Sequence, residues 1–385
     1  MNTRERFNAV MAFEENSRNI KLEYGYWAGL IKKWNEGNNG VFEGVSTELA
    51  DIDLIRTSIP LVEGTEEKSL DTKLMAYFGL EPYPVKFPCN FSPMADKKII
   101  EKNNDFTVFI DEYCLTQKVL AGGTSVPMTL DYAVKNRNDF ENYKSLYSNK
   151  FNNRLPDNFD MLANKLKNRD FAIRLGGHPF GFCGIARHIM GEFNYMLGLY
   201  DNPLLIKEIN EFYLNFVCDY WAEILKKVEI DWIMIWEDMA FKTGPIISRE
   251  AFREFMSPYY VRFIDFLKQY KVKNIIVDSD GLIEELIPLW VELGVTGIFP
   301  MEAVNDIIKI RNEFPGLQII GGVDKRIALN DNTRDMDKEF EKIGILLKKG
   351  GYIPHIDHSI PMDTDFARFK QYRTRLNRHI DDFKD

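Results

Sequence analysis

The sequence predicts an α/β protein of the (β/α)8 TIM-barrel class, with an N-terminal elaboration of helix and hairpin. In the second half of the chain, short β-branched apolar runs alternate with amphipathic stretches of helical length, which is typical of a parallel sheet covered by helices. Each of these runs ends on a charged or metal-capable side chain. In a closed barrel the carboxyl ends of the strands meet at one mouth, which holds the active site. We therefore expect an enzyme.

Six runs show this pattern and supply most of the candidate site residues. They are Phe171–Leu175 before His178, Asp231–Trp236 before Glu237 and Asp238, Asn274–Val277 before Asp278 and Asp280, Val295–Met301 before Glu302, Leu317–Val323 before Asp324, and Gly351–Pro354 before His355 and His358.

The first 150 residues are less regular than the rest. A first helix is expected at Thr3–Phe13, and Lys21–Trp27 is the candidate first barrel strand. Two β-rich runs around an Asp-Glu turn predict a hairpin at Phe106–Leu120, which would form a lid over the mouth or a surface for a partner. We expect one domain over residues 1–385, with an elaborated part at 1–150 and regular βα repeats at 151–385.

Composition narrows the class of protein. The chain has 385 residues, of which 45% are hydrophobic, so it supports a large core, and its net charge of −9 argues against binding nucleic acid or an anionic membrane. No apolar run reaches the length of a membrane span, and the first residues lack the apolar region of a signal peptide. The four cysteines form no C-x-x-C pair. These features predict a soluble cytoplasmic protein.

Two pairs of acidic residues follow predicted strands. Adjacent residues of a strand point to opposite faces, so at most one of Glu237 and Asp238 faces the mouth, and Glu237 is favoured as metal ligand or general acid/base. The alternative is a cap on the following helix. Asp278 and Asp280, two residues apart, would face the same side and repel unless a cation or a shared proton compensates. The alternative for Asp280 is again a helix cap.

Glu302 and Asp324 each allow two interpretations. Glu302 follows an apolar run and precedes a predicted helix, so it is either a site carboxylate or a helix cap. Asp324 follows Gly321-Gly-Val, where glycine lets a ligand approach the backbone closely. It is expected to bind substrate or to form an ion pair that closes the barrel.

Histidines and aromatic residues complete the candidate site. His358 lies beside Asp357 at the end of the last predicted strand, and imidazole is both a common metal ligand and the usual acid/base at neutral pH. His178 would bind substrate or hydrogen-bond within its own tight loop. Most aromatic residues belong in the core, but Tyr26 is expected to line an apolar pocket suited to an aromatic ligand.

Several segments together resemble a known family over nearly the full length. They are Asn2-Thr-Arg-Glu-Arg-Phe, Pro179-Phe-Gly-Phe, Asp278-Ser-Asp-Gly, Gly294-Val-Thr-Gly-Ile-Phe-Pro, Gly321-Gly-Val-Asp, and Gly351-Tyr-Ile-Pro with Asp357-His-Ser. On these segments the chain resembles the uroporphyrinogen decarboxylase superfamily, whose members are (β/α)8 barrels. The superfamily includes porphyrinogen decarboxylases and corrinoid-dependent methyltransferases, so the resemblance leaves the reaction open.

Departures from two branches narrow the resemblance. The decarboxylases carry an early arginine-rich segment that binds the substrate's propionates, where this chain has Glu23-Tyr-Gly-Tyr-Trp. The coenzyme M methyltransferases hold zinc through His-x-Cys and a later Cys, where this chain has Asp278-Ser-Asp280 and His358. The chain therefore looks most like the O-demethylase-type methyltransferases, which bind zinc with carboxylates and His and pass a methyl group to a corrinoid protein.

This resemblance implies a zinc Lewis acid that polarises the oxygen of a methyl ether or phenyl methyl ether, while the corrinoid of a partner protein accepts the methyl group. The expected metal ligands are His358 with two of Glu237, Asp278 and Glu302, and the expected catalytic residues are Glu237, Asp278 and His358. The expected substrate-binding residues are His178, Asp280, Asp324 and Tyr26. The alternatives are a uroporphyrinogen-type decarboxylase, a metal-dependent hydrolase or isomerase, and a non-catalytic binding protein.

Overall fold

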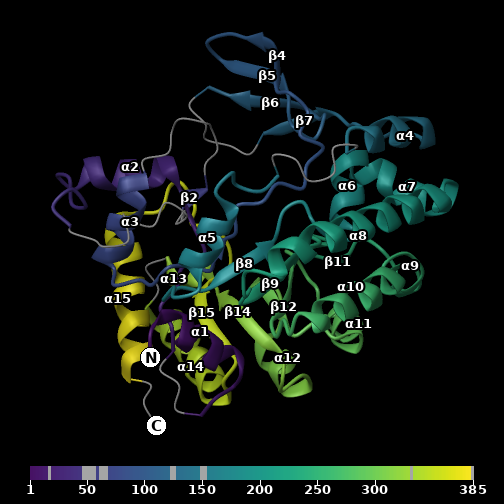
Figure 1. Ribbon diagram of the computed structural model, residues 1–385. Helices are drawn as coiled ribbons and strands as arrows, with labels where there is room; N and C mark the ends of the chain where they lie inside the picture. Colours follow the sequence, from purple (N-terminus) through teal and green to yellow (C-terminus); the bar gives the residue numbers. More distant parts are fainter. Residues whose placement is uncertain are drawn as a thin grey trace.

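A computed structural model describes residues 1–15, 19–45, 58–59, 68–121, 127–147, 154–329 and 333–382. Its centre is a curled parallel sheet of seven strands, whose spatial order follows the order along the chain (Figure 1). The strands are β3 (Val85–Lys86), β8 (Ile173–Gly176), β9 (Trp232–Trp236), β12 (Ile275–Asp278), β13 (Gly297–Met301), β14 (Gln318–Val323) and β15 (Tyr352–Ile356). The α/β class that the sequence predicts is therefore confirmed.

The eight-stranded closed ladder is not found among the described residues, because β3 and β15 are the edges of the seven-stranded sheet. Residues 21–25, the larger part of the predicted first strand, lie between these edges without forming a ladder. The carbonyl of Lys21 accepts from the Glu81 N–H at 2.9 Å, and the Glu23 carboxylate accepts the Ile356 N–H at 3.0 Å. The buried Glu23 side chain thus accepts a backbone N–H of β15 that would otherwise donate to a neighbouring strand.

Only the end of the predicted first strand is a β-strand in the structure. It is β1 (Tyr26–Trp27), which pairs in parallel with β2 (Ser58–Ile59) in a separate two-stranded sheet. Helix α2 (Ala28–Gly37) follows β1 directly, and α3 (Lys68–Tyr77) follows β2 along the chain.

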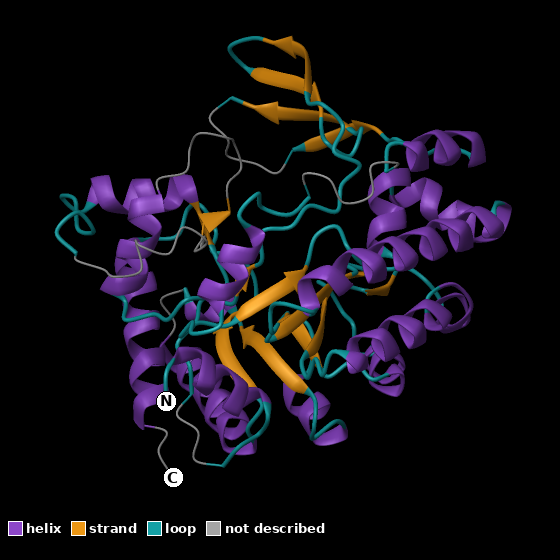
Figure 2. Ribbon diagram, viewed as in Figure 1, coloured by secondary structure: helices purple, strands orange, loops and turns teal. Residues whose placement is uncertain are grey.

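Helices cover the outer surface of the curled sheet (Figure 2). Following the regular repeats, they are α5 (Phe159–Leu166), α6 (Gly184–Met190), α7 (Glu192–Asp201), α8 (Pro203–Leu225), α9 (Arg249–Phe255), α10 (Ser257–Gln269), α11 (Ile287–Leu293), α12 (Ile307–Glu313), α13 (Lys325–Ala328), α14 (Thr333–Lys349) and α15 (Phe366–Asp382). A small hairpin of β10 (Ala240–Phe241) and β11 (Gly244–Pro245) follows β9. No helix within the described ranges is long and apolar enough to cross a membrane.

Both faces of the sheet are apolar, and alternate residues of each strand belong to different cores. In β9, Ile233 and Ile235 pack outward with the helices, whereas Trp232 and Met234 pack inside the curl. The inner core also contains Ile276 and other residues from most of the strands, so the interior is filled rather than open.

Helix α1 (Thr3–Met11) closes the amino end of the curled sheet. It begins with a capping box in which the Asn2 side chain accepts from the Glu5 N–H and the Glu5 carboxylate accepts from the Asn2 N–H. Its apolar face, which includes Phe7, Val10 and Met11, belongs to the inner core.

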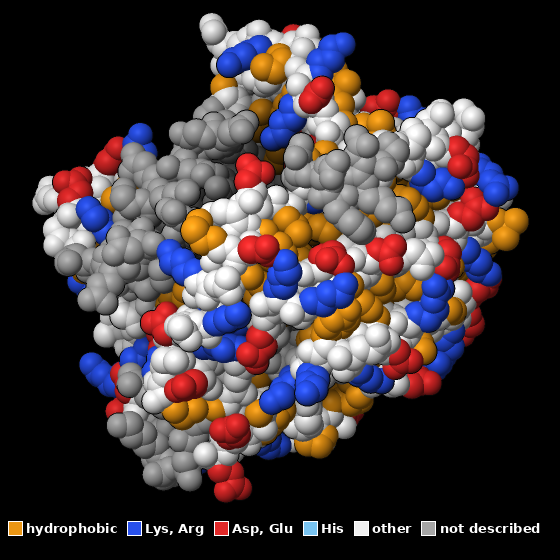
Figure 3. Space-filling view, viewed as in Figure 1, with side chains coloured by type: hydrophobic (Ala, Val, Ile, Leu, Met, Phe, Trp, Pro, Cys, Tyr) orange, Lys and Arg blue, Asp and Glu red, His pale blue; other side chains and the backbone are white. Residues whose placement is uncertain are grey.

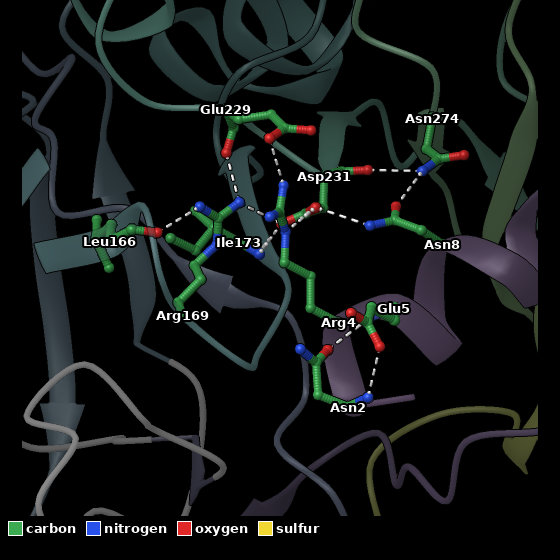
Figure 4. Close-up of polar contacts among 10 residues, drawn as sticks. All are labelled: Asn2, Arg4, Glu5, Asn8, Leu166, Arg169, Ile173, Glu229, Asp231 and Asn274. Atoms are coloured by element: carbon green, nitrogen blue, oxygen red, sulfur yellow. Dashed lines mark hydrogen bonds and ion pairs between the residues drawn. The ribbon is translucent and has the colours of Figure 1, made fainter. Parts of the chain in front are cut away.

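A polar network joins α1 to the amino ends of the strands (Figure 4). The Asp231 carboxylate, of which 1% is exposed, accepts hydrogen bonds from Arg4 at 2.7 Å, Asn8 at 2.9 Å, Arg169 at 2.6 Å and the backbone N–H of Ile173 at 2.9 Å. The buried carboxylate therefore has four hydrogen-bond donors, and two of them are the cationic side chains of Arg4 and Arg169.

A four-stranded antiparallel sheet projects from the body of the molecule (Figure 1). It consists of β4 (Lys98–Lys102), β5 (Phe106–Ile110), β6 (Thr116–Leu120) and β7 (Met128–Asp131), and α4 (Arg137–Ser145) follows it. Strands β5 and β6 confirm the predicted hairpin, with Phe106 opposite Leu120. The projecting sheet exposes apolar and basic side chains together (Figure 3), and its role as lid or partner surface stays a prediction.

Candidate active site

Ionisable side chains gather at the carboxyl end of the seven-stranded sheet, which we call the mouth. Arg174, Asp278 and His355 continue the inward-facing rows of β8, β12 and β15, because each stands two residues after a member of the inner core. Asp238, Asp280 and His358 follow on the loops just beyond β9, β12 and β15. The strand ends therefore bring together residues that are far apart in sequence.

Three aspartates of the mouth, Asp278, Asp238 and Asp280, lie close enough for their charges to interact. Burial raises the pKa of Asp278 well above its usual range, and the charges of Asp280 and Asp238 add to this rise, against the opposing effect of Arg174. Within the described part of the chain, no donor hydrogen-bonds to the Asp278 carboxylate, although this residue is only 9% exposed. Asp278 is thus poised to keep a proton.

Asp238 is held by its backbone and by a nearby arginine. Its φ of +50° lies in the left-handed region, and its carboxylate accepts the Asp280 N–H at 3.2 Å and lies 3.7 Å from the Arg187 guanidinium. Burial and the Asp280 charge raise the pKa of Asp238, while Arg187 lowers it. Asp238, rather than Glu237, is therefore the acidic residue after β9 that reaches the mouth.

His358 is paired with Asp280 and stacked on an aromatic ring. Its Nε2 lies 3.2 Å from Asp280 Oδ2, its Nδ1 lies 3.0 Å from Ser359 Oγ, and its ring stacks on Tyr24 with centroids 4.9 Å apart. Burial lowers the pKa of His358, but the hydrogen bond and charge of Asp280 outweigh it, so the net shift is upward. The pairing favours the imidazolium, which is a proton donor.

Aromatic rings surround these charges. Tyr24 stacks on Phe299 with centroids 5.3 Å apart, and Tyr83 lies 6.3 Å from the buried His355 ring. Burial lowers the pKa of His355 to about 4, so this histidine is neutral. His178 lies edge-on to Trp236 at 4.4 Å, and burial lowers its pKa to about 4 as well. The mouth therefore offers flat apolar surfaces beside its charges.

Two cations stand side by side at the mouth on β3 and β8. Lys86 and Arg174 are Cα partners in the parallel ladder, and both side chains alternate with residues of the outer core. Burial and the neighbouring Arg174 charge lower the pKa of Lys86, and burial lowers the pKa of Arg174. Lys86 nevertheless stays exposed, so solvent reaches it.

The structure places Glu237 away from this cluster, on the outward face of β9. Its carboxylate is fully buried and accepts the backbone N–H groups of Phe182, Cys183 and Gly184 and the hydroxyl of Tyr260 at 2.6–2.9 Å. These bonds anchor the start of α6. The contacts of Glu237 thus fit a helix cap, but the helix is α6, which precedes β9, and not the following helix that the sequence suggested. These contacts give no support to its predicted metal and catalytic roles.

Three other predicted residues also have structural contacts. Asp324 caps α13 and pairs with Arg326 at 2.6 Å, which is a contact within its own turn and not the barrel-closing ion pair that the sequence suggested. Glu302 stands at the mouth, where it accepts the Gly281 N–H at 2.8 Å. Tyr26 is 1% exposed and packs edge-on against Trp34 and Phe369, so it lies in the outer core and not in a substrate pocket. Tyr24 takes the place expected of Tyr26.

The predicted zinc ligands do not assemble in the described parts of the chain. Nowhere in these ranges do three His, Cys, Asp or Glu side chains converge closely enough to hold a metal ion. Glu237 faces α6, and His358 pairs with Asp280. In this arrangement the predicted ligands do not fit a zinc site.

Sequence reasoning missed Lys86, Arg174 and Tyr24 as residues of the mouth. Arg174 had a visible signal, because a charged residue in the middle of an apolar strand requires a polar surrounding. Lys86 had none, since β3 is only two residues long and is flanked by prolines. Tyr24 lies outside any strand, so no periodicity identifies its direction.

The fold and the mouth together define an α/β protein with its ionisable residues at the carboxyl ends of a curled parallel sheet. A family model described as uroporphyrinogen decarboxylase (URO-D) matches residues 115–378, more than half of the chain. The chain belongs to this family.

No curated protein matches the chain. Among solved structures, it is similar to 3-keto-D-glucoside 4-epimerase, YcjR, from E. coli, with 12% identity and a TM-score of 0.33 over 58% of this chain and 84% of that chain. It is also similar to xylanase B from Clostridium stercorarium F9, with 12% identity and a TM-score of 0.30 over 52% of this chain and 71% of that chain. At these TM-scores the likeness supports no conclusion about this protein.

Proposed function

We propose that the protein is a methyltransferase of the URO-D family that moves a methyl group from a small O-methylated aromatic donor to the cobalt of a corrinoid carried by a partner protein. The observation that supports this proposal best is the position of His358. Its Nε2 lies 3.2 Å from Asp280 Oδ2, and its ring stacks on Tyr24 with centroids 4.9 Å apart. An imidazolium beside an aromatic surface suits protonation of an aryl ether oxygen.

His358 has the central role in the proposed reaction. The reduced corrinoid of the partner would supply the nucleophile for the methyl carbon. As the C–O bond breaks, its electron pair stays on oxygen, and His358 delivers its proton there, so that a neutral hydroxyl leaves. Asp280 orients the imidazole and favours its charged form. Tyr24 and Phe299 position the ring of the donor by stacking.

Asp278 and Asp238 shape the electrostatics of this step. The raised pKa of Asp278 keeps it protonated over a wider pH range, so it can donate a hydrogen bond to the donor oxygen. The pKa of Asp238 is also raised, chiefly by burial. A polar substrate group that enters the mouth therefore meets two carboxyl groups with a raised pKa and the imidazole of His358, whose pKa is raised as well.

Methyl transfer is tested with purified protein, a panel of methoxylated aromatics and free cob(I)alamin in place of the partner's corrinoid. Methylcobalamin formation is followed by absorbance, and the phenol product by chromatography. His358→Gln should slow transfer about 10²–10⁴-fold, the usual contribution of a positioned acid. The matched control is His379→Gln, because His379 lies on α15 against Phe340, remote from the mouth. Equal rates for His358→Gln and wild type would refute the assigned acid.

Zinc stays a prediction and has a separate test. Metal analysis of wild type beside His358→Ala measures it directly. Zinc in the wild type that is lost in the variant would mean that the donor groups rearrange around a metal. An equal zinc content in both proteins would place any metal elsewhere.

A second candidate is favoured by the adjacent cations Lys86 and Arg174, which suit a carboxylated substrate. In a decarboxylation, His358 would protonate the carbon that loses carbon dioxide. The same panel, extended to aromatic and pyrrole carboxylates, distinguishes the two reactions. Carbon dioxide release without methylcobalamin would replace the methyltransferase assignment with a decarboxylase.

A further inference from the structure

The strongest unexplained feature of the mouth is a pair of cations without a counter-ion. Lys86 and Arg174 are direct ladder partners on β3 and β8. Among the described residues, neither side chain forms an ion pair, although arginines elsewhere in the interior, such as Arg169 and Arg373, pair with carboxylates. Adjacent like charges repel, so this arrangement is stable only where an anion or water compensates.

The contacts of Arg174 show how incompletely the protein satisfies it. Its guanidinium has one contact with the Gly176 carbonyl at 3.4 Å and one with the Met234 sulfur at 3.1 Å, and its Nε has no partner within the described structure. A thioether is a weak acceptor. A guanidinium with five donors therefore keeps most of them available.

The acidic residues of the mouth do not neutralise this pair. Asp278 is the carboxylate that most affects Arg174, but burial and its neighbours Asp280 and Asp238 hold its pKa well above the usual range. No hydrogen bond joins Asp278 to Arg174 in the part of the chain that the structure describes. The mouth is thus divided into a cationic side on β3 and β8 and an acidic side on β9, β12 and β15.

We propose that Lys86 and Arg174 form an anion-binding site that holds the carboxylate of an aromatic substrate. The guanidinium fork matches the two oxygens of a carboxylate, and Lys86 adds a second charge that solvent reaches. Aromatic rings lie between the two sides, since Tyr83 precedes Lys86 on the chain and contacts His355, and Phe299 contacts Tyr24.

This assignment deepens the proposed function and rests on it for the aromatic frame of the donor. A carboxylate bound by Lys86 and Arg174 anchors one end of the donor, and the ether oxygen at the other end is directed toward His358. The site then selects methoxybenzoate-type donors over neutral methoxybenzenes, because only the former have a group that compensates the two cations.

Binding measurements test the site without requiring turnover. Calorimetric titration compares 4-methoxybenzoate, neutral methoxybenzene and inorganic phosphate on the wild-type protein. The variants are Lys86→Met and Arg174→Met, which keep chain length while they remove charge. The matched control is Lys165→Met, because Lys165 is an exposed lysine on α5. Circular dichroism confirms folding, and Lys86→Met, at an exposed side chain, tests the site even if Arg174→Met fails to fold.

We expect 4-methoxybenzoate to bind the wild type at least about tenfold more tightly than methoxybenzene, and each mouth variant to lose about tenfold in affinity for 4-methoxybenzoate alone. Unchanged affinity in Lys86→Met would overturn the site. Phosphate that displaces 4-methoxybenzoate at equal concentration would overturn the carboxylate assignment.

The binding and turnover results separate the two proposals. Charge-dependent binding without methylcobalamin formation would leave the anion site in place and overturn the methyltransferase. Methyl transfer at equal rates from charged and neutral donors, unchanged in Lys86→Met, would overturn the anion site and leave the methyltransferase in place.

Discussion

The two ends of the curled sheet each contain a buried aspartate, but the two carboxylates differ in the number of hydrogen-bond donors around them. At the amino end, Asp231 accepts from two arginines, an asparagine and a backbone N–H (Figure 4). At the mouth, Asp278 is also nearly buried, yet among the described residues its carboxylate accepts no hydrogen bond from a side chain or backbone donor and faces two further aspartates.

This contrast separates stability from function within one fold. The amino end resembles an optimised structural network, in which each charge has a partner. The mouth keeps charges that destabilise the folded state until a ligand or proton arrives, which is the usual arrangement of an active site. Removal of the paired Asp231 should therefore destabilise the protein, whereas neutralisation of the unpaired Asp278 should stabilise it.

The largest effect is expected for Asp231→Ala. Removing this carboxylate leaves Arg169, whose side chain is 2% exposed, as an uncompensated buried charge. We expect the free energy of unfolding to fall by about 3–5 kcal/mol, the typical cost of breaking a buried ion pair. Urea unfolding measures it. The control Asp265→Ala removes an exposed partner of Lys268 and should stay within about 0.5 kcal/mol of wild type. A similar loss in both variants would remove the contrast.

A smaller loss is expected for Glu237→Gln. The amide group cannot accept from all of the donors at the start of α6 and the Tyr260 hydroxyl, because one of its two ends carries N–H groups. The free energy of unfolding should fall by about 1–3 kcal/mol. The rate per folded molecule should stay at the wild-type value. Loss of activity without loss of stability would instead restore Glu237 to the catalytic site.

Asp278→Asn should stabilise the protein. The folded state keeps the proton of Asp278 while the unfolded chain releases it near its ordinary pKa of 3.8, so the stability of the wild type falls as pH rises above this value. The variant lacks this loss, and we expect a gain of about 0.5–2 kcal/mol at pH 7 that vanishes below pH 3.8. Thermal unfolding across pH measures it. A pH-independent difference would contradict the titration as its cause.

The smallest effect on stability is expected for Asp280→Asn. The raised pKa of His358 gives stability that is complete below its ordinary value of 6.5 and is lost as pH rises through the folded value. Because both side chains are partly exposed, we expect a loss of only about 0.2–1 kcal/mol below this pH. The readout specific to the proposed acid is the pH profile of turnover, whose basic limb should move to lower pH. An unmoved limb would exclude the pairing as the control of His358.

The sequence predicted six of the seven strands of the sheet, because each of these six is an apolar run that ends at a polar residue, whereas β3 shows no such pattern. It did not predict the direction of β9, since both of its faces are apolar and the alternation of Ile235 and Trp236 carries no polarity signal. The choice between Glu237 and Asp238 was therefore made without information on which face was inward. After the last strand, where only Asp357 separates His358 from β15, the predicted residue does lie at the mouth.

Residues of the first half were harder to predict for a related reason. Lys86 and Tyr24 owe their positions to long-range contacts, with Arg174 and with His358 respectively, and not to any local pattern. Tyr26 was expected in the substrate pocket because it stands in an aromatic run, but the chain turns after Gly25 and carries it against α2 and α15.

The closure of the amino end by α1 also has a consequence for biosynthesis. This helix is translated before the residues that it contacts, since Arg4 contacts Asp231, which is 227 residues later, and the Met11 carbonyl accepts from Gln318, which is 307 residues later. The apolar face of Phe7, Val10 and Met11 can be buried only after most of the chain has been translated. Nascent chains should therefore engage holdase chaperones through this segment until β14 has emerged.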